Sequence, residues 1–244
     1  MIQAGRRRSL EVCVIAVALA ANALMPPAML VRQAHAQDAG AWEFDAGEPG
    51  CQRVAIIFNI GMGYEPRMTV LDQLAATGVP ATVFPMGWWA RMNPYLVSYM
   101  GNDGFVVGSH GDQPIPMTMR GDWEIAQDVE DARASITDAL GWAPSPYFTF
   151  YAADRDDRVR TVVANQGEVP VGFTVSADDW VGDATPMSVY TSVVNNIYDG
   201  AIVEFHLDAP NTAGSTEISL PWIVADLQAA GYTFVTVPEM ASPC

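Results

Sequence analysis

From Arg53 onward, short apolar runs alternate with segments of helical pattern, and this alternation constrains the fold more than any other feature of the chain. Each apolar run is as long as a buried strand, and the segment after it is long enough for a helix. We expect strands over residues 54–58, 81–84, 105–107, 146–150, 171–175, 201–205 and 232–235. Strands that alternate with helices predict a parallel sheet, closed as a barrel or left open. The length of 244 residues suits a small (β/α) barrel better than an eightfold one.

Prolines and capping residues mark where the intervening helices begin, and glycines mark where several of them end. The expected helices cover residues 66–76, 93–101, 122–140, 154–165, 186–198 and 216–230. The chain holds no internal repeat and no low-complexity tract. We therefore expect one folded domain over residues 51–244, preceded by an N-terminal extension over residues 37–50.

Residues 1–36 have the pattern of an export signal. A basic start at residues 6–8 precedes an apolar stretch over residues 12–24, and Ala34-His35-Ala36 has the small residues of a cleavage site. The apolar stretch is shorter than the about 20 residues of a membrane-spanning helix. We expect an exported protein, periplasmic or extracellular, that is not integral to a membrane. The general and the twin-arginine export routes both remain open.

Cleavage after residue 36 would leave two cysteines, Cys51 and Cys244, one at each end of the folded domain. In an oxidising compartment such a pair predicts a disulfide that joins the two ends. Two free thiols are the alternative.

The chain carries a formal charge of −16, and all of its basic residues are arginines. A protein this acidic should not bind nucleic acid, because it repels a phosphate backbone. Neutral or cationic glycans, small molecules and proteins remain as partners. We expect a monomer.

Ionisable and aromatic side chains follow the predicted strands, where parallel α/β folds place their chemistry. The two histidines of the domain both do so, His110 after residues 105–107 and His206 after residues 201–205. The other candidates in such positions are Asp112, Asp179, Asp208, Trp88, Tyr151 and Trp180. Carboxylates beside aromatic faces suit a sugar, which stacks its C–H face and donates its hydroxyls. Each residue also has a structural interpretation: a core histidine, a helix-capping carboxylate or a hydrophobic collar of tryptophans.

Several of these segments resemble, in order, the motifs of NodB-type polysaccharide deacetylases, which form carbohydrate esterase family four. The segments are VAIIFNIG (54–61), VPATVF (79–84), GFVVGSH (104–110), SADDW (176–180), GAIVEFH (200–206) and LPWIVADLQAAGYTFVTV (220–237). The resemblance covers about residues 53–240. It implies a distorted (β/α)7 barrel that removes acetyl groups from N-acetylated glycans, such as peptidoglycan or chitin, with the help of a divalent metal such as zinc.

The resemblance also assigns roles, and half of them fall on unexpected residues. Asn59 stands at the position of the catalytic base, and Ile60 stands where a metal-binding aspartate is expected. His110 matches the first metal-binding histidine, but Pro114 replaces the second. In our alignment Thr149 replaces the arginine that orients the base. Asp112 is the tentative second metal ligand, since a single matched ligand cannot make a three-ligand site.

The acid half of the site is matched in full. Asp179 corresponds to the aspartate that tunes the acid histidine, and His206 corresponds to that histidine. A carboxylate beside the imidazole would raise its pKa and hold it ready to donate a proton. Trp88, Trp180, Tyr151 and Asp208 are the candidate substrate contacts, because each of them follows a predicted strand.

Three functions are consistent with this pattern. The first is a deacetylase with a rearranged site, acting on N-acetylated or O-acetylated glycans of the cell envelope or the environment. The second is a non-catalytic glycan-binding relative, and the third is a structural or partner-binding envelope protein that reuses the fold.

Overall fold

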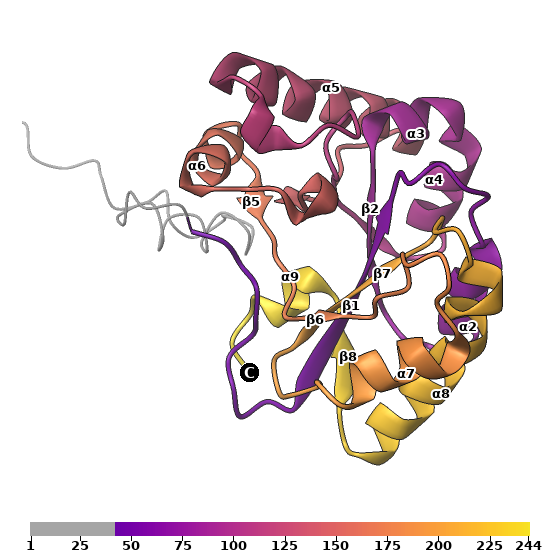
Figure 1. The fold of residues 1–244 in the computed structure, drawn as a ribbon. Helices are drawn as coiled ribbons and strands as arrows, with labels where there is room; N and C mark the ends of the chain where they lie inside the picture. Colours follow the sequence, from indigo (N-terminus) through magenta and orange to yellow (C-terminus); the bar gives the residue numbers. More distant parts are fainter. Residues whose placement is uncertain (1–41) are drawn as a thin grey trace, which may run out of the picture.

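A computed structural model describes residues 42–244, so the predicted export signal lies outside the described residues. At the centre of Figure 1 runs β1 (Arg53–Ile60), seven of whose eight residues are buried. It pairs in parallel with β2 (Thr82–Pro85), with β7 (Ile202–His206) and, at its amino-terminal end, with β8 (Thr233–Val235). Burial on both faces is the reason why this strand is an uninterrupted apolar run in the sequence.

The remaining strands extend the parallel arrangement on both sides. β3 (Val106–Val107) pairs with β2, and β6 (Val175–Ser176) pairs with β7, so the order is β3-β2-β1-β7-β6. β4 (Tyr147–Phe148) and β5 (Val169–Pro170) form a separate parallel ladder, which a single bridge from Ser109 to β4 connects to the end of β3. The predicted α/β class with a parallel sheet is confirmed.

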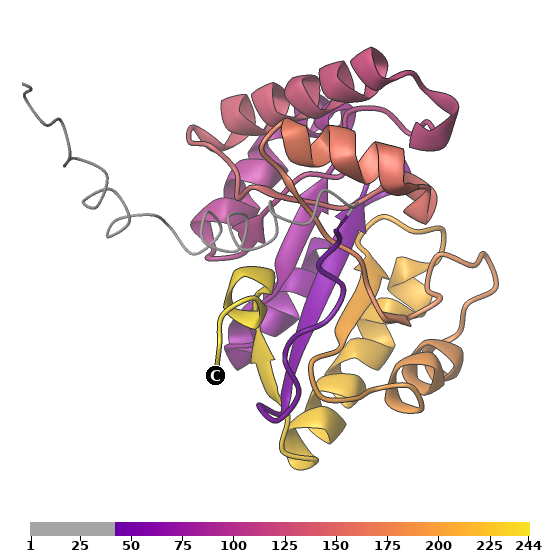
Figure 2. The ribbon, with the colours of Figure 1, turned by 90° about the vertical axis from the view of Figure 1, so that its left-hand side faces the viewer.

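Residues 42–47, which we call the N-terminal strap, lie between β5 and β7. The Phe44 N–H donates to the Pro170 carbonyl at 2.8 Å, and the Gly47 N–H donates to the Gly200 carbonyl at 2.8 Å. The strap therefore links two strands that do not pair with each other, and Figure 2 shows it as the indigo segment that leads into β1.

Helices surround the strands (Figures 1 and 2). The helices are α2 (Met68–Thr77), α3 (Gly87–Met92), α4 (Pro94–Asn102), α5 (Asp122–Leu140), α6 (Asp157–Asn165), α7 (Pro186–Val194), α8 (Thr216–Ala229) and α9 (Val237–Met240). Three short 3-10 turns are η1 (Met117–Met119), η2 (Tyr151–Ala153) and η3 (Thr212–Gly214). Six of the helices match predicted ones, whereas α3 and α9 are too short to give a helical period.

The two faces of β1 pack against different cores. This alternation decides which side chains at the end of the strand point into the interior. Val54, Ile56 and Phe58 pack outward against the helices, whereas Ala55 and Ile57 face the interior with residues of β4, β5, β7 and β8. Because side chains alternate along a strand, the next inward position on β1 is Asn59.

β7 follows the same rule. Ile202 belongs to the interior core, so Glu204 and His206 are the next inward positions. Asn59 and His206 are paired in register. The carboxyl ends of the two central strands therefore direct polar groups into the interior at one level.

The predicted strand over residues 171–175 is the main difference between expectation and structure. β5 ends at Pro170 and β6 begins at Val175, and the residues between them cross from one ladder to the other. Val171 bridges to Phe44 of the strap, whereas the Thr174 N–H donates to the Ile202 carbonyl. The apolar run predicted as one strand thus serves two different neighbours.

Two further sequence predictions can be compared with the structure. Cys51 and Cys244 form a disulfide with their Cα atoms 5.9 Å apart, within the usual range, so the predicted pairing is confirmed. Within residues 42–244, no helix is long and apolar enough to cross a membrane.

Candidate functional site

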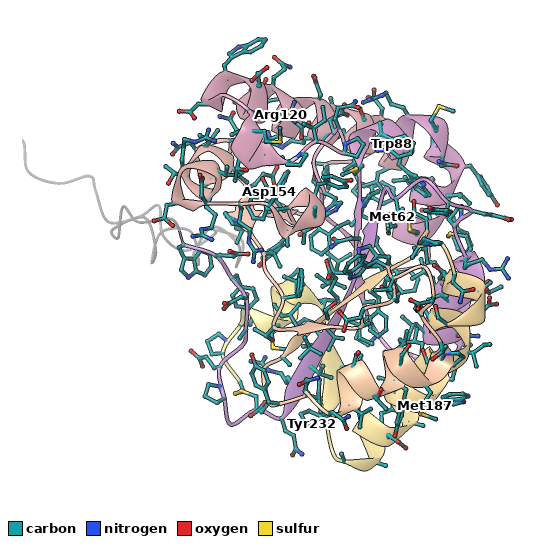
Figure 3. All side chains as sticks on the ribbon, viewed as in Figure 1. Met62, Trp88, Arg120, Asp154, Met187 and Tyr232 are labelled. Atoms are coloured by element: carbon teal, nitrogen blue, oxygen red, sulfur yellow. A yellow bond between two sulfur atoms is a disulfide. The ribbon has the colours of Figure 1, made fainter. Side chains whose placement is uncertain are left out.

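A cavity of about 450 Å³ opens where β1, β6 and β7 end. Loops that follow β3 and β4 complete it, which is the face where parallel α/β folds place their chemistry. Its lining residues are Asn59, Ile60, Gly61, Met62, His110, Tyr151, Ala152, Ala153, Phe173, Ser176, Asp178, Trp180, Glu204 and His206. Met62 is labelled in Figure 3. The structure thus brings both histidines of the domain to one cavity.

Asp179 and His206 form the pair that the sequence predicted. The Asp179 carboxylate accepts from the His206 backbone N–H at 2.9 Å and bonds His206 Nδ1 at 2.8 Å. Thr216, the first residue of α8, donates its hydroxyl to the same carboxylate at 2.8 Å. Asp179 is fully buried, so these bonds hold the imidazole in one orientation.

Electrostatics keep this imidazole charged. Burial lowers the pKa of His206, but the charge of Asp179 and its hydrogen bond outweigh burial, and the pKa rises to about 9. At neutral pH the ring is an imidazolium whose Nδ1–H is bound to Asp179. The other ring nitrogen therefore carries a proton that it can donate. We call Asp179, Glu204 and His206 the charged wall.

A second group of residues at the cavity forms a chain of neutral hydrogen bonds. The Thr149 hydroxyl has a single proton, which it donates to Asn59 Oδ1 at 2.8 Å. His110 Nδ1 lies 2.8 Å from the same hydroxyl oxygen and must therefore be the donor in that bond. The chain fixes the tautomer of His110 and leaves its Nε2 unprotonated. We call Asn59, His110 and Thr149 the neutral wall.

His110 stays uncharged across the physiological range. Burial and, to a smaller extent, the nearby charge of His206 lower its pKa to about 3. Thr149, where the family resemblance expects an arginine, supplies a neutral link from this histidine to Asn59.

The residues of the cavity do not fit the divalent metal that the resemblance implies. Ile60 has no donor atom, and His110 offers one nitrogen. Asp112 does not line the cavity, because its carboxylate is bound by Arg91, with Nη2 3.0 Å from Oδ2, and by Gln113. No group of three His, Cys, Asp or Glu side chains within residues 42–244 is placed to hold a metal ion. The tentative ligands His110 and Asp112 are therefore not brought together.

The four predicted substrate contacts separate into two pairs. Tyr151 and Trp180 line the cavity, and Trp180 is 50% exposed, so its ring is free to stack on a ligand. Trp88, labelled in Figure 3, does not line the cavity, and its indole N–H lies 3.1 Å from the Met86 sulfur.

Asp208 is fully buried and does not line the cavity either. Its carboxylate accepts backbone N–H groups of Gly61 at 3.1 Å and Gly63 at 2.9 Å. These bonds hold the loop that contributes Gly61 and Met62 to the cavity. Asp208 thus positions a loop and has no direct access to a ligand.

Glu204 is the lining residue that sequence reasoning missed. It lies within the apolar run of residues 201–205, which was interpreted as strand only. Burial raises its pKa to about 7, while the charge of His206 and a hydrogen bond from Asn59 oppose the rise. A lone carboxylate in a buried strand is costly to place, so it was the signal that could have revealed this residue.

Backbone strain is concentrated at the same cavity. Four non-glycine residues among 42–244 have positive φ, and three of them line it: Ala152 (52°), Ala153 (51°) and Asp178 (54°). Such conformations cost of order 1–3 kcal/mol each and cluster at functional sites.

Comparison with known proteins identifies the class to which this fold and cavity belong. The family model described as polysaccharide deacetylase matches residues 46–171, and the chain belongs to this family. Wild-type BA3943 of Bacillus anthracis, described as a CE4 family pseudoenzyme, superposes with a TM-score of 0.77 at 22% identity, over 84% of this chain and 71% of that one. The predicted distorted (β/α)7 barrel of NodB type is thereby confirmed.

Curated relatives give the same family. The peptidoglycan-N-acetylglucosamine deacetylase PgdA of Listeria monocytogenes is 29% identical over 190 residues, which are 78% of this chain and 39% of that protein. The uncharacterized protein YlxY of Bacillus subtilis is 27% identical over 198 residues, or 80% of this chain and 59% of that one. The chain thus spans only part of the length of these two relatives.

Proposed function

We propose that this protein removes acetyl groups from glycans of the cell envelope or the environment by hydrolysis. The single observation that carries the proposal is the Asp179–His206 pair, whose histidine lines the cavity. An imidazolium held by a buried carboxylate can donate a proton to the sugar oxygen or nitrogen when its bond to the acetyl carbon breaks. Polysaccharide deacetylase membership supports the reaction class.

The substrate class follows from the rest of the cavity and from the charge of the chain. Tyr151 and Trp180 offer aromatic faces for a sugar ring. The formal charge of −16 favours neutral or cationic glycans. An acetyl ester has a better leaving group than an acetamide, and the donor atoms here do not fit a Lewis-acid metal. O-acetyl groups are therefore included as substrates beside N-acetyl groups.

Export is part of the proposal. The Cys51–Cys244 disulfide suits an oxidising compartment, where the protein would meet cell-wall or environmental glycans.

Glycan binding without turnover is the second candidate function. It is favoured by Ile60 and Asn59, which leave the neutral wall without a carboxylate. The fold neighbour described as a pseudoenzyme supports this alternative. In that case Trp180 would stack on the saccharide, and Trp180→Ala would weaken binding while no acetate is released.

Acetate release separates the two candidates. The exported form is incubated with chitooligosaccharides, peptidoglycan and an O-acetylated glycan, in chelator and with added zinc, and a coupled assay detects acetate. We expect release from at least one glycan, and a loss of about 10²–10⁴-fold in His206→Gln. Saccharide binding without release supports the second candidate. If the protein neither releases acetate nor binds a saccharide, both candidate functions are contradicted.

A further inference from the structure

We propose that Glu204 is the general base of this hydrolysis and takes the proton from the attacking water that a carboxylate at position 59 would otherwise take. The inference rests on the proposed function. It assigns a role to a buried carboxylate that the matched motifs leave unassigned.

The strand register places Glu204 beside the reacting groups. Glu204 and His206 are both inward positions of β7, separated by two residues and hence by about 7 Å along the strand. Both line the cavity, and Asn59 is the register partner of His206 on the adjacent strand. A carboxylate and an imidazolium at this separation leave room for an acetyl group and a water molecule between them.

The hydrogen bond to Asn59 orients the carboxylate. Because Asn59 Oδ1 accepts from Thr149, its Nδ2 must point the other way, and it donates to Glu204 Oε1 at 2.7 Å. Within residues 42–244, no further hydrogen bond engages the Glu204 carboxylate. Asn59 thus holds one oxygen and leaves the second free to accept a proton. In this proposal β7 instead of β1 supplies the carboxylate, and the Asn59 amide anchors it.

The charges around the cavity set the protonation states that this role needs. Groups that act on Glu204 or His206 come from every neighbouring element: Asp179 after β6, Asp208 after β7, His110 after β3, and Arg155 after η2. With a pKa of about 7 for Glu204 and about 9 for His206, both groups are ionised between these two values. In that interval the carboxylate can accept a proton and the imidazolium can donate one.

The proposed step balances without any additional reactant. Glu204 takes one proton from water while the water oxygen forms a bond to the acetyl carbonyl carbon. When the tetrahedral intermediate collapses, the bond from this carbon to the sugar oxygen or nitrogen breaks, and that atom takes the proton of His206. The products are acetic acid and the free hydroxyl or amine. The proton on Glu204 then passes to the neutral His206, which restores both groups.

Glu204→Gln is the decisive variant, because the amide oxygen of Gln still accepts the hydrogen bond from Asn59 but cannot take a proton. The double variant Asn59→Asp/Glu204→Gln returns a carboxylate to β1. Glu168→Gln is the control: it neutralises another buried carboxylate, which Arg133 Nε contacts at 2.9 Å outside the cavity. For each variant, kcat and KM are measured from pH 5 to 10 on the glycan from which the wild type releases most acetate.

The proposal predicts that Glu204→Gln lowers kcat by about 10²–10⁴-fold with little change in KM. The wild type should lose activity as the pH falls through about 7. This acid limb of the pH profile should be absent in Glu204→Gln. The double variant should recover at least about tenfold, and Glu168→Gln should keep the wild-type kcat.

Different outcomes separate the two proposals. An active wild type with an unchanged kcat in Glu204→Gln overturns the role of Glu204 and leaves the proposed function standing. If Glu204→Gln does not fold, a wild type whose activity does not fall as the pH drops through about 7 overturns that role equally. A wild type that releases no acetate from any glycan overturns the proposed function, and the role of Glu204 falls with it.

Discussion

The charged wall and the neutral wall each contribute a histidine to the same cavity, but burial has opposite outcomes for the two rings. On the charged wall, His206 keeps its proton because a fully buried carboxylate is bonded to it. On the neutral wall, His110 is equally enclosed, but its partner is the Thr149 hydroxyl, and it loses its proton. Two histidines in one cavity thus differ in pKa from about 3 to about 9, according to which partner each one contacts.

This difference shows which parts of the family's machinery can change independently. The acid half depends on a carboxylate that also bonds the backbone of β7 and the start of α8, so its loss would disturb the fold. The side chains of the neutral wall bond one another and, through Asn59, the Glu204 carboxylate. We therefore expect substitutions on the neutral wall to disturb the fold less than the loss of Asp179.

Among the substitutions that test this contrast, Asp179→Asn has the largest expected effect. It removes a buried charge that holds three hydrogen bonds, so we expect the free energy of unfolding to fall by about 3–5 kcal/mol. Acetate release should fall by about 10²–10⁴-fold, because the imidazole loses its charge.

Urea denaturation and the acetate assay measure the two effects of Asp179→Asn. The matched control for stability is Asp178→Asn at the preceding residue, which is exposed and should change the free energy of unfolding by less than about 0.5 kcal/mol. Equal stability of the two variants would show that the charged wall does not depend on this carboxylate.

The pH dependence of stability tests the charge of His206. Its pKa in the folded protein, about 9, exceeds the ordinary value of 6.5, so its contribution is complete below pH 6.5 and disappears as the pH rises through 9. The stability difference between wild type and His206→Gln should therefore shrink by on the order of 3 kcal/mol over that interval.

Denaturation at closely spaced pH values measures this loss. The raised pKa of Glu204 acts mainly between pH 4.5 and 7, so the window from pH 7 to 9 isolates His206. A difference that stays constant through this window would contradict the assigned charge of the imidazole.

The smallest expected effect is that of Thr149→Val on the neutral wall. The substitution removes the hydroxyl that links His110 to Asn59 and should lower the free energy of unfolding by about 1–3 kcal/mol. Acetate release should fall by less than about tenfold, because no charge is lost. Thr149→Ser, which keeps the hydroxyl, is the control in the same denaturation and activity assays. A loss of activity as large as that of Asp179→Asn would contradict the contrast between the walls.

The sequence alone predicted the fold and the Asp179–His206 pair of the charged wall, for reasons visible in particular residues. Apolar runs such as that of β1 show strand positions directly. Because side chains alternate between the two faces of a strand, the position of a polar residue at its end decides which face that residue lies on. His206 and Asp179 could be paired in advance through the family resemblance, and the structure places β6 and β7 side by side in the sheet.

The rest of the site depended on side-chain directions that no pattern encodes. Asp112 was a candidate ligand by position, but Arg91 binds it away from the cavity. Trp88 and Trp180 were equivalent in the sequence, yet only Trp180 lines the cavity. Glu204 was overlooked because a single charge inside an apolar run does not change the periodicity that predicts a strand.

The strap limits where the chain can be shortened. Its Glu43 accepts from Arg155 Nε at 2.9 Å and from Arg160 Nη1 at 3.0 Å, and Arg155 follows the strained turn that lines the cavity. The cleavage predicted after residue 36 would leave this anchor in place. A recombinant chain that starts at the first core strand would instead release the segment between β5 and β7, and with it the support of one rim of the cavity.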